Sequence, residues 1–362
     1  MLSPREALRT LALYHPPLAG RKGLRLDFNE NTVGCAPRVL EKLRNLDAEQ
    51  LAKYPERGPV EALVADFLKV APSELLLTNG VDEAIHLLCE TYIEPGDDAL
   101  IVVPTYSMYR IYAMAAAAKV VSTPLGIGFK FSLDSVLRSI TKRTRLIAIA
   151  NPNNPTGTIA SREDLLAIAR SAPEAAVLVD EAYFEFYGET MLRAWEEFPN
   201  LFIARTFSKA YGLAGLRIGV LAGSAEQMNA VRRVASPYNV NAVALACLPE
   251  AIADQSYIER YVEEILEARV RLERSLEASG IQFWPSRANF VLLRAGTSSA
   301  DVSRFVELMR RRGILVRDRS GDPGCEGCVR ITLGPREHAD RLLSALQETF
   351  EELGIAQGAS QP

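Results

Sequence analysis

The sequence predicts an α/β fold in which a large domain is built on a mostly parallel central sheet and a smaller α+β domain packs on its end. The chain has 362 residues, more than one hydrophobic core usually serves, so two domains are expected. Its middle alternates short apolar runs with helix-period segments, which is typical of βαβ units. Beyond about residue 255 this alternation gives way to longer, charged helices separated by single strands.

The elements of the large domain follow from this alternation. The apolar runs predict strands at 75–78, 99–103, 119–123, 145–150, 176–179, 201–205 and 217–222. The segments between them predict helices at 81–93, 107–117, 132–140, 161–171 and 210–214. We therefore expect residues 46–250 to form the large domain.

The rest of the chain predicts the smaller domain. Its expected elements are a charged amphipathic helix at 256–279, the strand FVLLR, a helix at 300–312, a strand at 313–317, the strand in VRITLG and a last helix at 336–353. The first 45 residues do not fit the parallel pattern. We expect residues 1–45 to join residues 251–362 as an N-terminal arm of the smaller domain.

Composition and charge exclude several classes of partner. The net charge of −4 comes from 41 basic and 45 acidic residues without blocks of one sign, which gives no reason to expect nucleic acid or an anionic membrane. No run approaches the roughly 20 apolar residues of a membrane span. The N-terminus, MLSPREALRTLALYHPP, lacks the apolar stretch of a secretory signal. We expect a cytoplasmic protein that acts on small molecules.

Polar and aromatic side chains follow five of the predicted strands. These strands are followed, in chain order, by NGVDEAI, PTYSMY, NPNNPTG, DEAY and TFSKAYGLAGLRIG. In an open parallel sheet, ligands bind beyond the carboxyl ends of the strands. We therefore expect the five segments to line a single site.

The same segments suit pyridoxal 5′-phosphate (PLP), whose aldehyde needs an amine, whose pyridine nitrogen needs a carboxylate and whose phosphate needs donors. Lys209 follows one strand and Asp180 ends another, so both are expected at the same rim. Ser208 and Arg217 could bind the phosphate, as could the helix N-terminus that begins in GVDEAI. Tyr106 is suited to stack on the pyridine ring.

Each of these residues has an ordinary structural explanation when taken alone. A lysine after a strand is usually a solvated charge, and an aspartate at a strand end is more often a helix cap. NPNNPTG could be a tight turn. The ordered occurrence of Asn154, Asp180 and Lys209, each beyond a separate strand, is what favours a PLP site.

These motifs give the chain a resemblance to a known family. With FSKAYGLAGLRIG, and with NPNNPTG followed by DEAY, the chain resembles the class I/II PLP-dependent aminotransferases from about residue 10 to residue 350. LDFNENTVG, YPE at 54–56 and TNGVDEAI are similar to the histidinol-phosphate branch of that family. The resemblance implies the PLP-dependent transferase fold type I, PLP as cofactor and a homodimer with shared active sites.

The resemblance also implies roles for the cofactor-binding residues. Lys209 would form the internal aldimine with PLP and move the proton between substrate and cofactor. Asp180 would pair with the pyridinium nitrogen, while Asn154 and Tyr183 would hydrogen-bond the ring oxygen O3′. The phosphate would be bound by the backbone N–H groups of Val81 and Asp82, by Thr206, Ser208 and Arg217, and by Tyr54 of the other subunit.

For the substrate, the resemblance points mainly to the smaller domain. Arg330, in VRITLG, matches the arginine that binds the α-carboxylate of glutamate. Tyr14 and Arg317 match positions that hold the phosphate of histidinol phosphate, and Asn31 is also expected in the substrate site. Arg319 stands in the same arginine-rich stretch and could serve in place of Arg317.

Two features depart from the family pattern. Thr32 follows the NEN triplet where the family usually has proline. The glycine-rich loop 318–328 carries Cys325 and Cys328, but no second ligand pair is spaced to complete a zinc site. We therefore expect no metal and interpret the cysteine pair as part of a turn. Both departures could alter what enters the pocket.

The implied reaction is ping-pong transamination of L-histidinol phosphate with 2-oxoglutarate, giving imidazole acetol phosphate and L-glutamate, a step of histidine biosynthesis. An aromatic-amino-acid aminotransferase and a threonine-phosphate decarboxylase on the same scaffold are the alternatives. A PLP-sensing regulator would carry a DNA-binding domain ahead of this one, and about two dozen residues precede LDFNEN. We therefore expect an enzyme.

Overall fold

The computed structural model describes residues 2–9, 11–13 and 20–354. Its largest sheet has seven strands in the order β2-β8-β7-β6-β5-β3-β4. They lie where the apolar runs predict strands: β2 (Leu75–Thr78), β3 (Asp98–Val103), β4 (Lys119–Pro124), β5 (Thr144–Ala150), β6 (Ala176–Asp180), β7 (Leu201–Thr206) and β8 (Gly219–Gly223). The strands from β3 to β7 are parallel, whereas β8 is antiparallel to β7 and β2. The prediction of a mostly parallel sheet is confirmed.

Helices cover both faces of this sheet, because successive residues of a strand point to opposite sides and each side must bury an apolar surface. One face is covered by α5 (Val81–Tyr92), α6 (Ser107–Ala115) and α9 (Ala225–Arg232). The other is covered by α4 (Gly58–Leu68), α7 (Leu133–Ser139), α8 (Arg162–Ser171) and α10 (Ala242–Ala253). The sheet is thus the middle layer of three.

Residues 210–214 do not form the predicted helix. They form a turn that leads into a short 3₁₀ helix at Ala214–Leu216. Gly212 adopts a φ of +69°, and a Cβ there would lie 2.6 Å from the carbonyl oxygen of Gly34. An α-helix needs φ near about −60°, so the close approach of the N-terminal segment decides the conformation here.

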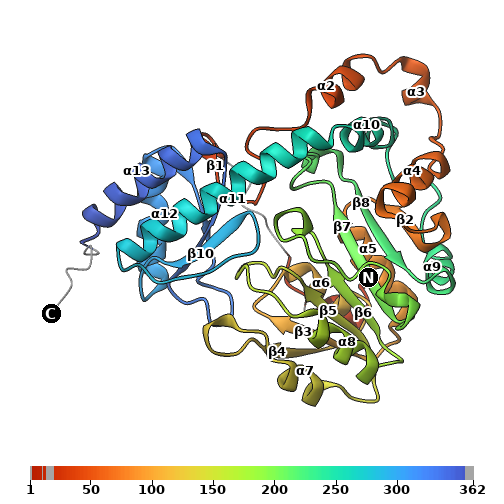
Figure 1. Cartoon of the computed structure of the whole chain (residues 1–362). Helices are drawn as coiled ribbons and strands as arrows, with labels where there is room; N and C mark the ends of the chain where they lie inside the picture. Colours follow the sequence, from red (N-terminus) through yellow and green to blue (C-terminus); the bar gives the residue numbers. More distant parts are fainter. Residues whose placement is uncertain (1, 10, 14–19, 355–362) are drawn as a thin grey trace.

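A smaller antiparallel sheet lies beside the large one, in the order β12-β13-β10-β9. Its strands are β9 (Phe283–Trp284), β10 (Phe290–Arg294), β12 (Arg317–Asp318) and β13 (Cys328–Thr332), and its helices are α11 (Gln255–Ala278), α12 (Ser299–Arg311) and α13 (Arg336–Glu352). Figure 1 shows α11 reaching from α10 to this smaller sheet. The predicted strand at 313–317 is divided between two sheets, because β11 (Ile314–Leu315) pairs with β1 (Leu24–Arg25) and not with β13.

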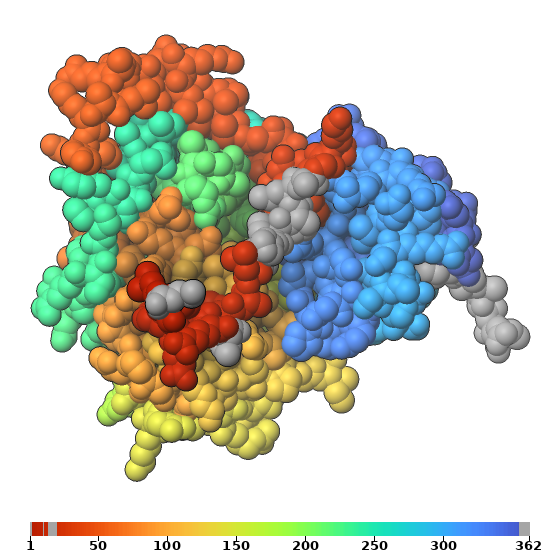
Figure 2. Space-filling model, turned by 180° about the vertical axis from the view of Figure 1, so that it is seen from behind, coloured from red at the N-terminus to blue at the C-terminus, as the bar shows by residue number. Residues whose placement is uncertain are grey.

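The N-terminal segment contacts both parts of the molecule. Residues 2–9 contain α1 (Glu6–Arg9), which lies against α6, and Arg5 donates to the carbonyl oxygen of Ala115 at 2.7 Å. Figure 2 shows this N-terminal stretch, in dark red, on the surface of the large domain. Farther along the chain, β1 joins β11 beside the smaller sheet. The next helices, α2 (Pro37–Arg44) and α3 (Ala48–Ala52), pack against α10 at the opposite end (Figure 1). Among the described helices, none is both long enough and apolar enough to cross a bilayer.

Candidate active site

A cavity of about 640 Å³ opens where the carboxyl ends of β5, β6 and β7 face the smaller sheet. The large domain contributes ten of the residues that the sequence predicts to bind the cofactor: Val81, Asp82, Tyr106, Asn154, Asp180, Tyr183, Thr206, Ser208, Lys209 and Arg217. From the other side, Arg317, Arg319 and Arg330 line the same cavity. The fold therefore brings an amine, a buried carboxylate and several guanidinium groups into one space.

Lys209 lies just beyond β7, and its Nζ donates to the backbone carbonyl of Phe28 at 3.1 Å. Burial, followed by the nearby Arg330 cation, lowers the pKa of Lys209 to about 8. Burial has this effect because it disfavours the charged ammonium. About a tenth of this amine is therefore unprotonated at pH 7, far more than for an ordinary lysine, and the unprotonated form is the one that a nucleophile or general base requires.

Asp180 ends β6, and the residue is only 5% exposed. Its carboxylate accepts a hydrogen bond from the Tyr109 hydroxyl at 2.5 Å and another from the backbone N–H of Ala182 at 3.0 Å. Burial raises the pKa of Asp180 to about 6 despite these bonds. Within the described residues Asp180 has no ion-pair partner. A buried carboxylate of this kind fits a ligand that brings its own positive charge, such as a pyridinium nitrogen.

The part of the cavity at the start of α5 suits a phosphate. The helix α5 begins at Val81, so its first backbone N–H groups have no partner within the helix. Gly80 precedes it with φ +77°, and a Cβ at that position would lie 2.8 Å from Arg217 Nη2. Arg217 forms an ion pair with Asp82 at 2.9 Å, and Ser208 adds a hydroxyl to the same region of the lining. These donors fit a phosphate group held against a helix N-terminus.

Two aromatic residues stand between these ends. Tyr106 donates its hydroxyl hydrogen to Asp82 at 2.8 Å, and its ring meets that of Tyr109 edge-on at 5.7 Å. Burial raises the pKa of Tyr106, so its hydroxyl stays protonated. The Tyr106 ring lines the cavity beside Asp180, where a planar ring could stack on it.

Arg330 connects the smaller sheet to the side chains that the large domain places in the cavity. It donates to the side-chain oxygen of Asn154, and to the backbone carbonyl of Asp27 at 2.7 Å. Asn154 in turn donates to the hydroxyl oxygen of Tyr183 at 3.2 Å. Burial lowers the pKa of Arg330 to about 9, and its Nε is buried without an acceptor in the described part of the chain. Arg330 itself lines the cavity, so its guanidinium group borders the space that an anionic substrate would enter.

Arg317 and Arg319 both line the cavity, so either side chain could contact a substrate anion there. Arg317 lies over the ring of Phe28, with its Cζ 5.0 Å from the ring centroid, and its Nη1 is buried without an acceptor in the described residues. Arg319 forms an ion pair with Asp322. Together with Arg330 they place three guanidinium groups on one wall, enough to bind substrates with one or two anionic groups.

Three residues predicted for the site are not part of this cavity's described lining. Tyr54 is 77% exposed and stacks on Tyr238, with ring centroids 4.3 Å apart. Asn31 donates to the backbone carbonyl of Ala210 at 3.0 Å and so holds the turn next to Lys209. Tyr14 lies outside the described residues.

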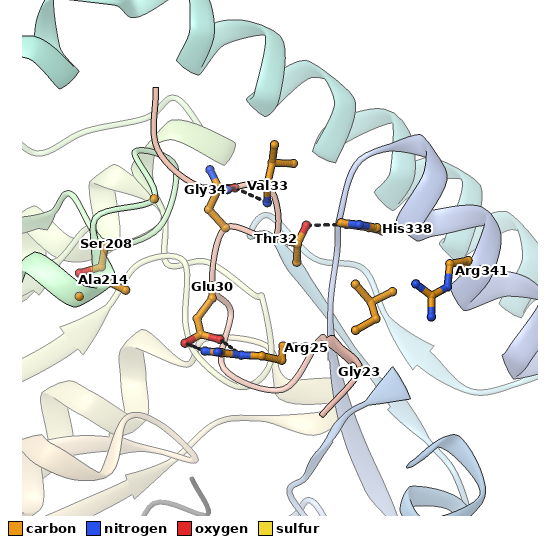
Figure 3. Close-up of a pocket in the computed structure, with 14 residues that line it drawn as sticks. Gly23, Arg25, Glu30, Thr32, Val33, Gly34, Ser208, Ala214, His338 and Arg341 are labelled. Atoms are coloured by element: carbon orange, nitrogen blue, oxygen red, sulfur yellow. Dashed lines mark hydrogen bonds and ion pairs between the residues drawn. The ribbon is translucent and has the colours of Figure 1, made fainter. Parts of the chain in front are cut away.

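A second cavity of about 580 Å³ adjoins the first, and Glu30 and Ser208 line both. Figure 3 shows Glu30 paired with Arg25 in this space and Thr32 facing His338. The Thr32 hydroxyl lies 2.9 Å from His338 Nδ1, a contact that the usual proline could not make. The departure at Thr32 therefore faces this second cavity and not the one that contains Lys209.

Cys325 and Cys328 are both free and buried. They belong to a small apolar cluster with Phe129 and Trp284. No group of three or more metal-binding side chains occurs among residues 2–9, 11–13 and 20–354.

Phe28, Asn29 and Tyr109 are among the cavity-lining residues that sequence reasoning missed. Tyr109 stands three residues after Tyr106, so helical spacing could have placed both near one face of α6. Phe28 and Asn29 lie inside LDFNEN, but nothing in their local pattern indicates a contact with residues far along the chain.

Comparison with known proteins adds independent information. The family model described as aminotransferase class I and II matches residues 21–346. The chain is 34% identical over 329 residues to a histidinol-phosphate aminotransferase of Thermoanaerobacter sp. (strain X514), covering 90% of this chain and 92% of that protein. It is 35% identical over 339 residues to a protein of the same name from Bacillus cytotoxicus, covering 91% and 90%.

A solved structure has a very similar fold. The histidinol-phosphate aminotransferase from Sinorhizobium meliloti in complex with pyridoxal-5′-phosphate superposes with a TM-score of 0.88 at 27% sequence identity. The match covers 96% of this chain and 98% of that one. The similarity therefore includes both the large sheet and the smaller one.

Proposed function

The chain belongs to the class I and II aminotransferase family, whose chemistry depends on PLP, and from that premise we propose that it transfers the amino group of L-histidinol phosphate to 2-oxoglutarate. The products are imidazole acetol phosphate and L-glutamate, so the reaction is a step of histidine biosynthesis. The single observation that carries the proposal is the wall formed by Arg317, Arg319 and Arg330 opposite Lys209. It offers positive charge to every anionic group of the two substrates.

PLP, when bound, supplies an electron sink for the bond that is broken at the substrate Cα. Lys209 is positioned to hold the cofactor and then to move the proton at that carbon, since its pKa is lowered to about 8. The carbonyl of Phe28, 3.1 Å from Nζ, holds the free amine at the edge of the cavity. Such a positioned general base contributes about 10²–10⁴-fold to rate.

The remaining contacts of the cofactor would be divided among the walls of the cavity. Asp180 would keep the pyridine nitrogen protonated, and Tyr106 would stack on the ring. Asn154 and Tyr183 would donate to the ring oxygen O3′, since both side chains line the cavity and are within 3.2 Å of each other. The phosphate would be bound by the N–H groups of Val81 and Asp82 at the start of α5 and by Thr206, Ser208 and Arg217.

The two half-reactions place different demands on the arginine wall. Histidinol phosphate carries one phosphate and no carboxylate, whereas glutamate carries two carboxylates. Arg330, which lines the cavity, would bind the α-carboxylate of glutamate. Arg317 or Arg319, with Tyr14, would bind the phosphate of the first substrate and the distal carboxylate of the second. A guanidinium group suits both roles because its paired N–H groups fit both kinds of oxyanion.

We further propose a homodimer in which Tyr54 completes the phosphate site of the partner subunit. The exposure of Tyr54, stacked on Tyr238 at the surface, supports this arrangement. Asn31 remains a predicted substrate-site residue, and its hydrogen bond to the backbone carbonyl of Ala210 positions the turn beside Lys209. A cytoplasmic location stays a prediction.

The domain division is proposed on the same basis. All strands of the seven-stranded sheet fall within residues 46–250, which supports a large domain over that range. The pairing of β1 with β11 supports assigning residues 1–45 with 251–362, although α2 packs against α10 and would contact the large domain.

The test is an amino-donor panel with purified, PLP-loaded protein. We expect histidinol phosphate to form glutamate from 2-oxoglutarate with a kcat/KM at least about tenfold above that for phenylalanine or tyrosine, since a buried charge pair contributes more than about 1.4 kcal/mol. Threonine phosphate is the third donor, and release of CO₂ without consumption of 2-oxoglutarate would indicate a decarboxylase instead. A higher kcat/KM for the aromatic amino acids would overturn the substrate assignment and leave the transaminase assignment intact.

A further inference from the structure

Asn29 lies in the N-terminal segment between β1 and α2, and it is only 1% exposed. Its side-chain Nδ2 lies 2.9 Å from the hydroxyl oxygen of Tyr183, the residue expected to face the ring oxygen of the cofactor. The geometry points to Asn29 as a positioning residue that makes Tyr183 a hydrogen-bond donor toward that oxygen. The inference rests on the proposed function only in taking PLP to occupy the cavity.

The direction of each hydrogen bond follows from which groups can only donate. The backbone N–H of Asn29 donates to Thr332 Oγ1 at 2.9 Å. The Thr332 hydroxyl can then direct its own hydrogen to Asn29 Oδ1, at 3.1 Å. This assigns Oδ1 as an acceptor and leaves the NH₂ group of Asn29 pointing at Tyr183 as a donor.

The Tyr183 hydroxyl oxygen also accepts from Asn154 Nδ2, at 3.2 Å. Both of its neighbours are amide NH₂ groups, which can only donate. The phenolic hydrogen therefore needs another acceptor, and none receives it among the residues that the structure describes. Tyr183 lines the cavity, so an oxygen of a bound ligand is the acceptor that completes the arrangement.

The backbone holds Asn29 in this orientation. Its φ is +55°, in the left-handed region that asparagine tolerates better than most residues. Asn289 Nδ2 donates to the backbone carbonyl of Asn29 at 3.2 Å and secures that conformation. Asn29 is thus fixed through its N–H, its C=O and its side-chain oxygen, and only its NH₂ group faces the cavity's tyrosine.

The arrangement also joins the cofactor pocket to the substrate-binding strand. Thr332 stands two residues after Arg330 on β13 and is paired there with Phe290, whose ring meets Tyr183 edge-on at 5.1 Å. The charged groups that act on Tyr183 are Arg330, Asp180 and Arg319. Burial is the largest influence and raises the pKa of Tyr183, so the hydroxyl keeps the hydrogen that it donates.

The predicted effect concerns the nitrogen that joins Lys209 to the cofactor. A hydrogen bond donated to O3′ stabilises negative charge on that oxygen and weakens its hold on the proton of the neighbouring nitrogen. The pKa of that nitrogen is therefore low while Tyr183 donates and rises when it does not. The visible absorption of the bound cofactor reports this protonation directly, independently of turnover.

We expect Asn29→Asp to raise the pH midpoint of the visible band by about one to two units, because the carboxylate would take the hydrogen of Tyr183. Thr332→Val adds no charge but removes the hydroxyl that holds both the backbone N–H and the side-chain oxygen of Asn29, so it should raise the midpoint by a smaller amount by freeing the Asn29 amide to rotate. Thr332→Ser keeps the hydroxyl and is the matched control, with the midpoint of the wild type. In a Tyr183→Phe background, the shift caused by Thr332→Val should vanish.

The outcomes separate this inference from the proposed function. If the wild-type protein shows no visible band with PLP, the proposed function is wrong. If the band is present but Asn29→Asp and Thr332→Val both leave its midpoint at the wild-type value, the role of Asn29 is wrong. A Thr332→Val shift that persists in Tyr183→Phe would equally overturn it, because the effect would not pass through the tyrosine.

Discussion

Tyr109 donates a hydrogen bond of 2.5 Å to the carboxylate of Asp180, across the interface between α6 and the end of β6. Tyr109 is completely buried and Asp180 nearly so. After burial, which raises the pKa of Asp180, this hydrogen bond is the largest influence and acts in the opposite direction. Tyr109 therefore helps to keep the Asp180 carboxylate charged, and a pyridinium nitrogen would need that charge as its partner.

Removing that hydroxyl should weaken cofactor binding. We expect Tyr109→Phe to raise the pKa of Asp180 further above its present value and to increase the Kd for PLP by about tenfold, since a hydrogen bond to a charged group contributes about 1.5–3 kcal/mol. Absorbance titration of the cofactor-free protein measures the Kd. Tyr112→Phe, on the same helix but outside the cavity lining, is the control. Equal affinities for the two variants would refute the role of Tyr109.

Replacing the amine at position 209 should separate chemistry from cofactor binding. We expect Lys209→Ala to lose at least about 10³-fold in the rate of amino transfer, as a positioned acid–base group is removed. The variant should still bind PLP, because the phosphate site at α5 is unchanged. Borohydride reduction followed by peptide mapping should label Lys209 in the wild type and leave the variant unlabelled. Full turnover by the variant would contradict the assignment.

The arginine wall predicts substrate-specific changes in KM. Arg330→Lys should raise the KM for glutamate by about 10–100-fold, since a lysine cannot reproduce a paired guanidinium contact. Arg317→Lys and Arg319→Lys should raise the KM for histidinol phosphate, and the larger effect identifies the residue that contacts the phosphate. Initial-rate kinetics with each substrate varied in turn provide the measurement. An unchanged KM for histidinol phosphate in both variants would place its phosphate elsewhere.

Gly80 offers a test of the phosphate site with a matched control. A Cβ at Gly80 would lie 2.8 Å from Arg217 Nη2, so Gly80→Ala should displace the guanidinium group and raise the Kd for PLP severalfold. Gly96 also has a positive φ, +94°, but a Cβ there would have no neighbouring atom within 4 Å. Gly96→Ala should therefore share the backbone strain, about 1–2 kcal/mol, without the loss of affinity. Similar Kd values for both variants would show that Arg217 does not need this space.

Glu185 predicts a pH dependence of stability in the cofactor-free protein. Its Oε2 is buried without a partner among the described residues, and burial raises its pKa from 4.5 to about 7. The folded state therefore binds this proton more tightly than the unfolded state, so the stabilisation is complete below pH 4.5 and is lost as the pH rises to about 7. Between these limits the free energy of unfolding of Glu185→Gln should rise by about 1–3 kcal/mol relative to that of the wild type, as measured by urea denaturation at each pH. A constant difference across the range would refute the shift.

The large sheet was predictable because a buried parallel strand needs a short apolar run whatever surrounds it, and because such runs alternate here with helices. The smaller sheet was less so. Residues 313–317 look like one strand, but Ile314 pairs with Leu24 and Arg317 pairs with Arg330. The half that contains Ile314 takes a partner from the far end of the chain, and no local pattern encodes that choice.

The amino-acid sequence by itself determined the chemistry: Lys209, Asp180 and Asn154 each follow a strand, and parallel strands deliver their ends to one rim. Tertiary structure alone decided what surrounds those groups. Asn29 meets Thr332, 303 residues farther along the chain, and Tyr109 meets Asp180 across 71 residues. Hydrogen-bond polarity and burial arise from such distant contacts, because both depend on which atoms lie within about 3 Å in space, not on neighbours in the chain.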